Sequence, residues 1–289
     1  PEGDVDGFAP VNVSAVTSSV DSNIRSENIK EGVSILGVNG SLKTGKYGIS
    51  FDAWVGNPVG GKPSTEQGSG TPNFVGVTNM SNYWLAYKFN GNQNITGVAS
   101  FPDLIGINGS NCLTGAFSGT KITSLSMPNL KTIVGPYACS YVCNQCSTLT
   151  SVDFSGLETI TGQEAFRNAF SYCTALMSVS FSSLKTINAS YVFMYLFSYC
   201  DNLTTVSFPA LETISGASIF DNAFRYCTAL TSVSFAKLNS ASDTQFTAML
   251  VGCSNVTVHF PSAMQSTMSS WTSVQNGFSG TNTTVLFDL

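Results

Sequence analysis

A twelve-residue pattern recurs every 27 residues along the middle of the chain, and this repeat limits the fold more than any other feature of the sequence. Five consecutive copies begin at Ile122, Leu149, Leu176, Leu203 and Leu230. A degenerate copy begins at Ile95 with one extra residue, and a shortened copy at Val256 closes the series. Because each unit can bury its apolar face only against its neighbours, the repeat predicts a solenoid with atypical terminal units.

The hydrophobic period changes halfway through each copy. The copy opens as L-x-x-V-x-F, whose two-residue alternation predicts a strand with Val and Phe pointing inward. The next segment places Phe166, Phe170 and Cys173 four and three residues apart, which indicates one face of a short helix. We therefore expect an α/β solenoid with a parallel sheet and short helical returns, gently curved and capped at both ends.

The sequence pattern of the copies resembles the BspA-like class of leucine-rich repeats, whose units have roughly the pattern A-F-x-x-C-x-x-L-x-x-I-x-I-P. The matching residues are Phe170, Cys173, Leu176, Val179 and Phe181, then Phe197, Cys200, Leu203, Val206, Phe208 and Pro209, then Phe224, Cys227, Leu230, Val233 and Phe235. The resemblance covers residues 95–260, in units a few residues longer than is usual for the family. It implies a surface-exposed adhesion or recognition protein and carries over no catalytic residue.

Charged residues make up only 10% of the chain, and 12 Lys and Arg against 17 Asp and Glu give a net charge of −5. No basic stripe is available to neutralise a phosphate backbone, so nucleic acid is not an expected partner. No apolar run approaches the length of a membrane span, and the first ten residues lack the features of a signal peptide. We therefore expect no membrane insertion, while the start at Pro1 leaves the question of upstream sequence open.

The eight cysteines allow two interpretations. Cys139, Cys143 and Cys146 have the C-x3-C-x2-C spacing that some iron–sulfur proteins use to hold a cluster. The repeat places the first two where the next copy has Phe166 and Phe170, which favours small buried core residues. A ladder of equivalent positions runs through Cys146, Cys173, Cys200, Cys227 and Cys253. We expect these thiols to be reduced, and we expect no cofactor and no metal.

The strand residues between the inward Val and Phe form a first candidate binding surface. They are mostly small hydroxyl residues, at Ser124, Ser126, Ser151, Asp153, Ser178, Ser180, Thr205, Ser207, Ser232 and Ser234. The strand spacing puts Asp153 about 20 Å from His259, the single histidine, too far for acid–base partnership. The candidate ligand contacts here are Asp153, Ser180, Ser207 and His259. The alternative is a solvated sheet surface.

A second candidate surface lies on the return segments, where tyrosine recurs just before the ladder cysteine. These candidate ligand contacts are Tyr172, Tyr199 and Tyr226, joined by Tyr137, Tyr141, Tyr191 and Tyr195. Tyrosine offers flat apolar area with a polar tip, which suits sugar rings or protein contacts. It suits packing between coils equally well, so both interpretations stay open.

The chain divides into four predicted segments. Residues 24–40 resemble the I-x-x-E-N-I-K-x-G-V-x-I-L-G-V-x-G element of phage and prophage tail-fibre proteins, which implies that residues 1–45 form an attachment or linker module. Residues 46–94, with Trp54 and Trp84, are predicted to cap the first coil. Residues 95–260 form the solenoid. Residues 261–289 are predicted to cap its end with a helix over residues 262–274 and a following strand.

These features together predict a non-enzymatic receptor-binding or adhesion protein, located in a virion tail or on a bacterial cell surface. Its expected partners are a cell-surface glycan or protein and, through residues 1–45, other proteins of a tail or surface assembly. A bacterial adhesin and a structural spacer are the alternatives, and the oligomeric state stays open. An enzyme such as a glycan depolymerase would need two carboxylates about 5–10 Å apart. The repeated acids Glu158 and Glu212 flank Lys185 and are typical of a solvated surface.

Overall fold

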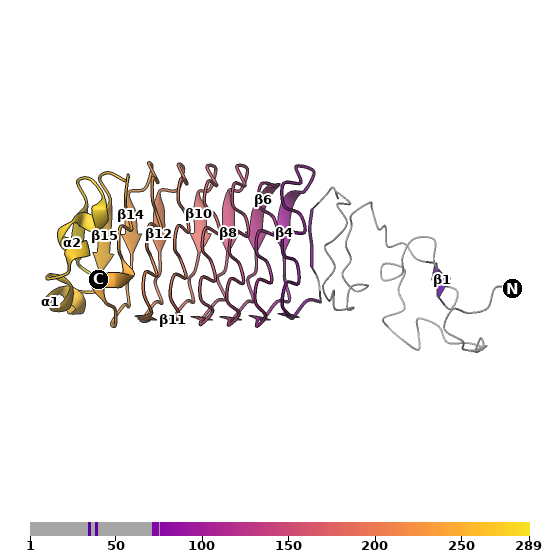
Figure 1. The fold of residues 1–289 in the computed structure, drawn as a ribbon, viewed down its shortest axis with the longest axis horizontal. Helices are drawn as coiled ribbons and strands as arrows, with labels where there is room; N and C mark the ends of the chain where they lie inside the picture. Colours follow the sequence, from indigo (N-terminus) through magenta and orange to yellow (C-terminus); the bar gives the residue numbers. More distant parts are fainter. Residues whose placement is uncertain (1–33, 36–37, 40–70, 75) are drawn as a thin grey trace.

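The computed structural model describes residues 34–35, 38–39, 71–74 and 76–289, and its main body is a solenoid of coils stacked along a nearly straight line in this view (Figure 1). β1 (Ser34–Ile35) and β2 (Val38–Asn39) pair with each other in antiparallel fashion. The rest of the predicted attachment module, residues 1–45, lies outside the described residues. The same holds for Trp54 and for the other residues of 46–70.

The predicted V-x-F strands form one side of the coils and pair in parallel, at an offset of 27 residues except between β4 and β6 and between β14 and β15, where it is 25 or 26. Val152 lies beside Val179, and Val206 beside Val233. Two four-stranded sheets result, because the ladder is interrupted between the fourth and fifth strands. The first sheet contains β4 (Thr96–Ser100), β6 (Lys121–Ser126), β8 (Ser151–Asp153) and β10 (Ser178–Ser180). The second contains β12 (Thr205–Ser207), β14 (Ser232–Ser234), β15 (Thr257–Phe260) and β16 (Thr284–Phe287).

A further parallel sheet of six short strands lines another side of the coils, and the sequence pattern did not predict it. Its strands are β3 (Asn79–Met80), β5 (Gly106–Ile107), β7 (Thr132–Ile133), β9 (Thr159–Ile160), β11 (Thr186–Asn188) and β13 (Thr213–Ser215). The coils that begin with β4, β6, β8, β10 and β12 therefore contain two strands each. The final Ile of the repeat, which the sequence pattern placed at the end of one strand segment, is the buried residue of this second strand.

The return segments differ from the predicted short helices, because they are chains of hydrogen-bonded turns. Alternate amides donate to the next coil, as Tyr141 does to the carbonyl of Arg167. The amides between them donate three residues back within the coil, as Val142 does to Cys139. An α-helix satisfies its amides four residues back, so these cross-coil bonds exclude regular helix. The four-residue spacing of apolar residues reflects a turn that repeats every four residues.

The core is built from ladders of buried phenylalanine that run along the solenoid axis. One ladder stacks Phe154, Phe181, Phe208, Phe235 and Phe260 at centroid distances of 5.1–5.8 Å. A second ladder, from the return segments, contains Phe166, Phe193, Phe220 and Phe246. These rings are fully or almost fully buried. The inward direction predicted for Val and Phe is thereby confirmed, with Val179 only partly buried.

The C-terminal segment is made of short pieces instead of the single helix predicted over residues 262–274. The pieces are the 3-10 helix η4 (Ser262–Met264), α1 (Gln265–Met268), α2 (Thr272–Gln275) and the 3-10 helix η5 (Gly277–Ser279). Met268 is buried, and Trp271 packs against Phe246. The chain then returns in β16, which pairs with β15 at the same 27-residue offset. A further 3-10 helix, η3 (Asp243–Gln245), lies in the preceding coil.

Residues at the other end also continue the register of the coils. β3 pairs with β5 at the 27-residue offset, and Tyr83 and Tyr87 donate their amides to the carbonyls of Ser110 and Thr114 in the next coil. Residues 79–94 thus make a coil of the same kind as those that follow. The division at residue 94 between cap and solenoid stays a prediction.

Candidate functional site: the tyrosine face

Residues of positive φ form three columns along the return segments, and together these columns define the tyrosine face. The first column is Tyr83, Asn111, Tyr137, Glu164, Tyr191 and Ser218. The second is Tyr87, Gly115, Tyr141, Asn168, Tyr195, Asn222 and Ala248. The third is Gly91, Gly119, Gln145, Tyr172, Tyr199, Tyr226 and Gly252. All nine tyrosines of the described residues belong to this face.

The third column brings together the three tyrosines predicted from the repeat. The rings of Tyr172 and Tyr199 stack with centroids 4.5 Å apart, and those of Tyr199 and Tyr226 with centroids 4.9 Å apart. Tyr172 remains 46% exposed and Tyr226 37% exposed, while Tyr199 between them is half-buried. The stack is therefore a surface feature that presents ring edges to solvent along three successive coils.

In the first and second columns, tyrosines occupy alternate coils only. Tyr83 and Tyr87 lie in one coil, and equivalent pairs follow two and four coils later at Tyr137 with Tyr141 and at Tyr191 with Tyr195. The coils between carry small or polar residues, at Asn111, Gly115, Glu164, Asn168, Ser218 and Asn222. Tyr83 and Tyr87 are 64% and 58% exposed. Aromatic pairs thus recur at every second coil, with polar gaps between them.

Glycine leaves room for a tyrosine ring of the preceding coil at two places. A Cβ added to Gly115 would lie 2.6 Å from the ring of Tyr87, and one added to Gly252 would lie 2.2 Å from that of Tyr226. Both glycines have positive φ, which glycine adopts without the steric cost of a side chain. The tyrosine rings therefore lean over the next coil in the C-terminal direction.

The ionised groups that the structure describes on this face include two with close local contacts. Arg167 donates to Oε2 of Glu164 at 2.6 Å, and Tyr137 donates to Oε1 of the same carboxylate at 3.2 Å. The Glu164 carboxylate raises the pKa of Tyr137, because it disfavours a second negative charge beside it. The guanidinium of Arg225 lies over the ring of Tyr226, 5.1 Å from its centroid. Glu164 is therefore paired with a cation, whereas Arg225 keeps its positive charge beside the ring of Tyr226.

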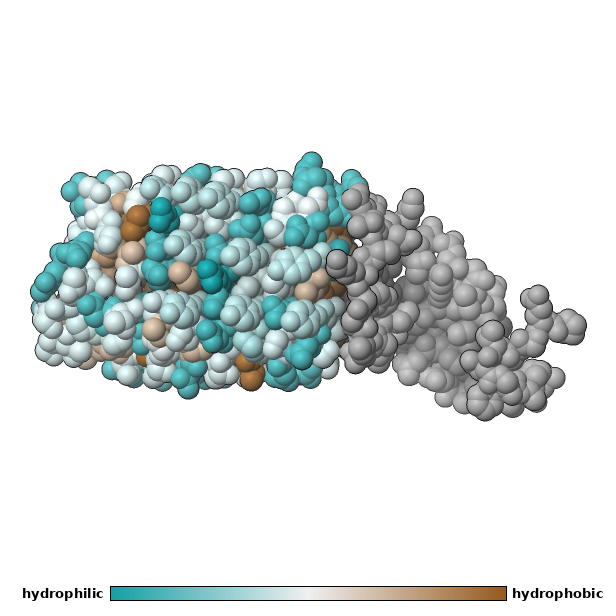
Figure 2. Space-filling view, viewed as in Figure 1, coloured by the Kyte–Doolittle hydropathy of each residue, from teal (hydrophilic) through white to brown (hydrophobic). Residues whose placement is uncertain are grey.

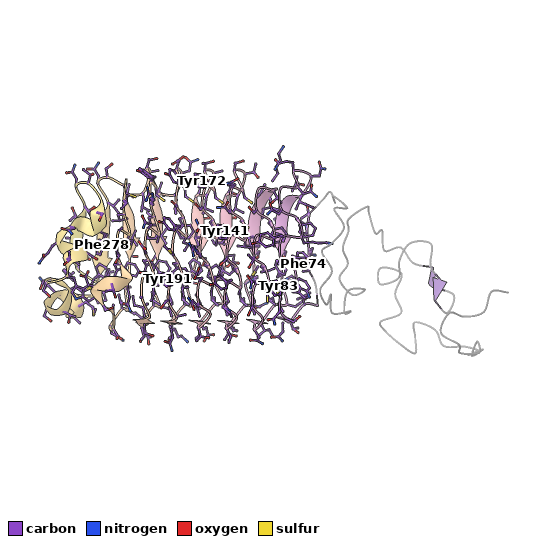
Figure 3. The ribbon with its side chains drawn as sticks, in the orientation of Figure 1. Phe74, Tyr83, Tyr141, Tyr172, Tyr191 and Phe278 are labelled. Atoms are coloured by element: carbon purple, nitrogen blue, oxygen red, sulfur yellow. The ribbon has the colours of Figure 1, made fainter. Side chains whose placement is uncertain are left out.

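The face runs along the length of the solenoid. In Figure 3, Tyr172 lies near one long edge, Tyr141 about halfway across, and Tyr83 and Tyr191 nearer the opposite edge. The space-filling view shows a mixed surface of mostly hydrophilic and intermediate colour with scattered hydrophobic residues (Figure 2). An extended ligand would therefore meet alternating aromatic and polar groups.

The predicted serine surface lies on the outward side of the V-x-F strands, and two pairs of its side chains bond to each other. Ser234 donates to Oγ of Ser207 at 2.9 Å, and Ser151 donates to Oγ of Ser124 at 3.0 Å. Ser207 is exposed. These bonds cross-link neighbouring coils and use part of the hydrogen-bonding capacity that a ligand would need.

Ser180 and Asp153, two other candidates on this surface, are half-buried neighbours on paired strands. The Asp153 carboxylate accepts the amide of Ser155 at 2.8 Å, the local contact of a turn that ends β8. This contact gives Asp153 a structural role in the turn. Its role in ligand binding stays a prediction.

His259, the remaining candidate, has a partner that the sequence did not suggest. Its Nδ1 lies 2.9 Å and 3.1 Å from the two carboxylate oxygens of Asp288, which follows β16. Because a carboxylate accepts hydrogen bonds, Nδ1 is the donor in this pair. The contact joins β15 to the residue after β16 and thus fastens the last strand of the sheet.

The cysteines lie in the core, where each ladder thiol bonds to a carbonyl of the preceding coil. Sγ of Cys173 donates to Cys143, and Sγ of Cys200 and Cys227 to Phe170 and Phe197. Burial raises the pKa of the Cys173, Cys200 and Cys227 thiols. Among the described residues, no group of three or more His, Cys, Asp and Glu is arranged to hold a metal ion.

The repeated charges form a ladder beside the second strand of each coil. Glu158 accepts from Lys131 at 3.2 Å and from Lys185 at 3.3 Å. These two lysines lower the pKa of Glu158. A general acid of a glycosidase needs the opposite shift, since it must hold its proton near neutral pH. This arrangement supports the solvated ion-pair interpretation of the repeated acids.

Sequence reasoning missed Tyr83 and Tyr87, Glu164 and the partner of His259. The two tyrosines carry a signal that could have found them: a Y-x3-Y pair recurs 54 residues apart at Tyr83, Tyr137 and Tyr191. Glu164 carries no such signal, because it occurs in one coil only. Asp288 lies outside the repeat copies recognised in the sequence.

The α-helices of the described residues, α1 and α2, contain four residues each. A helix that crosses a bilayer needs about 20 residues. None of the helices in this part of the chain reaches that length.

The sequence matches the BspA type leucine rich repeat region in six copies, over residues 85–195 and 140–271. No curated protein matches the chain. Among solved structures it is similar to the leucine rich repeat protein TpLRR of T. pallidum, at 19% identity and a TM-score of 0.35, over 71% of this chain and 91% of that one. A leucine-rich repeat protein of Bacteroides ovatus is similar at 18% identity and a TM-score of 0.38, over 72% of this chain and 57% of that one. The family matches together span more than half of the chain, which therefore belongs to the BspA-type leucine-rich-repeat family.

Proposed function

We propose that the chain is a non-enzymatic recognition protein whose tyrosine face binds a glycan or protein on a bacterial cell surface. The observation that carries this proposal is the stack of Tyr172, Tyr199 and Tyr226, which keeps large aromatic side chains at the surface over three coils. Tyrosine contributes apolar contact area and a hydroxyl at low entropic cost, and it is enriched at binding hot spots.

Backbone geometry supports a role for these tyrosines beyond packing. The nine described tyrosines have φ between 54° and 61°, a left-handed conformation that costs about 1–2 kcal/mol for a residue with a side chain. Glycine and asparagine adopt it more easily, and they occupy the same columns in other coils. Retention of a bulky side chain at a strained position is typical of functional sites.

An enzymatic function is less well supported. The family match and the similar structures indicate no catalytic family. Glu158, one of the two repeated acids, is engaged by Lys131 and Lys185. The His259–Asp288 pair lies on the last strands of the sheet. Ser234, which lies beside His259 on the paired strand β14, already donates a hydrogen bond to Ser207. We therefore assign the chain a binding role.

The proposed setting is a phage tail fibre or tail-associated component, with residues 1–45 attaching the solenoid to other tail proteins. This step rests on the resemblance of residues 24–40 to tail-fibre proteins. A bacterial surface adhesin is the alternative setting, and it follows from the BspA-type repeats. Deletion of residues 1–45 distinguishes an attachment module from a recognition module. If residues 1–45 serve attachment, the shortened chain still binds cells. If they serve recognition, it does not.

Binding of the purified chain to intact bacterial cells tests the proposal. Tyr199→Ala alters the tyrosine face, and Ser180→Arg alters the serine surface of the V-x-F strands. We expect cell binding to fall with Tyr199→Ala and to persist with Ser180→Arg. The reverse result would move the site to the serine surface, and no binding to any of a broad panel of cells would favour the structural spacer.

A further inference from the structure

The spacing of the tyrosine face indicates what kind of ligand it binds. Successive coils of a parallel sheet lie about 4.8 Å apart, and the stacked tyrosines of the third column agree, with centroids 4.5 Å and 4.9 Å apart. The aromatic pairs of the first and second columns recur at every second coil, and thus at about 10 Å. The face therefore has two periods along one axis, of one coil and of two coils.

An extended β-1,4-linked polysaccharide has the same two periods. Each pyranose unit advances such a chain by roughly the length of one sugar ring, which is close to the rise of one coil given by the 4.5–4.9 Å distances between tyrosine rings. Successive sugars face opposite ways, so the repeating unit is a disaccharide that matches two coils. Tyrosine pairs at every second coil would then meet the same face of each disaccharide.

The chemistry of the face also suits a sugar chain. The apolar C–H face of a pyranose packs on an aromatic ring, and tyrosine adds a hydroxyl at the ring edge. Between the tyrosine pairs, the half-buried Asn168 supplies an amide group that can both donate and accept hydrogen bonds. Sugar hydroxyls need partners of both kinds.

The charge pattern favours an uncharged ligand. Glu164 is held by Arg167 and Tyr137, and Arg225 lies over Tyr226. The amide of Asn222 donates to the carboxylate of Asp221 beside it. The charged groups described here are of both signs, Glu164 and Asp221 against Arg167 and Arg225, so they form no row of like charge that would select a strongly anionic polymer.

We propose that the tyrosine face binds an extended, uncharged, β-1,4-linked polysaccharide that lies parallel to the solenoid axis. This inference rests on the proposed function and specifies its ligand. The tyrosines of the first and second columns contact alternate sugars, and the third column borders the chain along one side. A ligand of this form gains contacts with every added disaccharide.

Titration calorimetry of the full chain with oligosaccharides tests the inference. The probes are cello- and chito-oligosaccharides of two, four and six sugars, with malto-oligosaccharides of equal length as controls, because their α-1,4 linkage gives a coiled chain. We expect affinity to rise roughly tenfold from disaccharide to hexasaccharide in at least one β-1,4 series. The malto series should bind weakly at every length.

Column-matched variants locate the binding. The double variant Tyr141→Asn with Tyr195→Asn places in the second column the residue that its neighbours Asn168 and Asn222 already have. We expect it to keep the thermal unfolding midpoint of the native chain and to lower hexasaccharide affinity roughly fivefold to thirtyfold. Ser180→Arg, on the serine surface, should leave the affinity unchanged.

Three results would overturn the inference. Affinity that does not depend on length, or is equal for the malto series, would exclude an axial β-1,4 chain. Unchanged affinity of the double variant would move the ligand elsewhere. Absence of oligosaccharide binding, with cell binding still lost in Tyr199→Ala, would leave the proposed function standing with a protein partner. Absence of both would remove the proposed function as well.

Discussion

Tyr172 and Tyr199 are 27 residues apart in sequence, yet their rings stack with centroids 4.5 Å apart and planes within 7° of parallel. The offset equals one repeat, so the distance between the rings is set by the rise of one coil. The stacking of the coils therefore sets the spacing of the tyrosines on this surface. Substitution of one tyrosine leaves the spacing of the others unchanged.

Tyr141→Asn separates the packing role of the second-column tyrosines from recognition. Because φ at Tyr141 is 55° and asparagine tolerates this region, we expect the free energy of unfolding to stay constant or rise by up to about 1 kcal/mol. Urea unfolding measures it, with Tyr141→Phe as the control that keeps the ring. A loss of more than about 2 kcal/mol would mean that the ring serves chiefly to pack the coils.

Gly252→Ala should destabilise the chain and displace the ring of Tyr226. The added Cβ would lie 2.2 Å from that ring, and overpacking of this kind costs about 1–3 kcal/mol. Gly91→Ala is the matched control, since Gly91 has a similar positive φ and nothing within 4 Å of the added Cβ. The difference between the two unfolding free energies isolates the clash. Equal values would show that the ring moves aside without cost.

Phe193→Ala removes one ring from the core ladder of the return segments. Phe193 is fully buried between Phe166 and Phe220, at centroid distances of 5.8 Å and 5.5 Å. We expect a loss of about 3–5 kcal/mol, measured by chemical unfolding. Met177→Ala, at a side chain that is 58% exposed, should change stability by less than about 0.5 kcal/mol. Similar losses in the two variants would contradict the assigned core.

Glu158→Gln tests the ion-pair ladder through its dependence on pH. Lys131 and Lys185 lower the pKa of Glu158 in the folded chain, so its carboxylate favours folding above the ordinary pKa of 4.5 and loses that effect as pH falls through the lowered value. We expect the native chain to be slightly more stable than the variant at pH 7 and equal to it at pH 2. The difference should shrink in high salt. A difference that persists at pH 2 would point to packing instead.

The cysteine thiols should resist alkylation in the folded chain. All eight are buried, and burial raises the pKa of Cys112 to about 12 and that of Cys253 to about 11. These two thiols therefore form few thiolates at pH 8, and burial limits reagent access to all eight. Iodoacetamide labelling followed by mass spectrometry should show slow reaction in buffer and rapid reaction in urea. Rapid labelling of Cys253 in buffer would indicate local opening of the last coils.

The sequence predicted those parts of the fold that depend on period. The 27-residue interval gave the stacking direction and register, and the V-x-F alternation gave the buried residues of the long strands, because a strand in a regular sheet has no freedom to change face. The placement of Tyr172, Tyr199 and Tyr226 in one column followed from the same interval. Their role in binding stays a prediction.

The rest depends on contacts that periodicity does not encode. The four-residue spacing of Phe166 and Phe170 fits a helix and a repeated four-residue turn equally well, and only the donation of alternate amides to the next coil distinguishes them. The second strand of each coil has two or three residues, too few for an alternation pattern. The pairing of His259 with Asp288 joins the last strands, where only one copy exists to compare.

The most direct test of the tyrosine face is chemical nitration of the native chain by tetranitromethane, with and without saturating amounts of the cells it binds. Peptide mass spectrometry then gives the extent of nitration at each tyrosine. The account predicts that cell binding protects Tyr172 and Tyr226, both exposed in the free chain, while acetylation of Lys131 and Lys185 in a parallel labelling is unchanged. Unchanged nitration of these tyrosines on cell-bound protein would contradict the assignment of this face as the recognition surface.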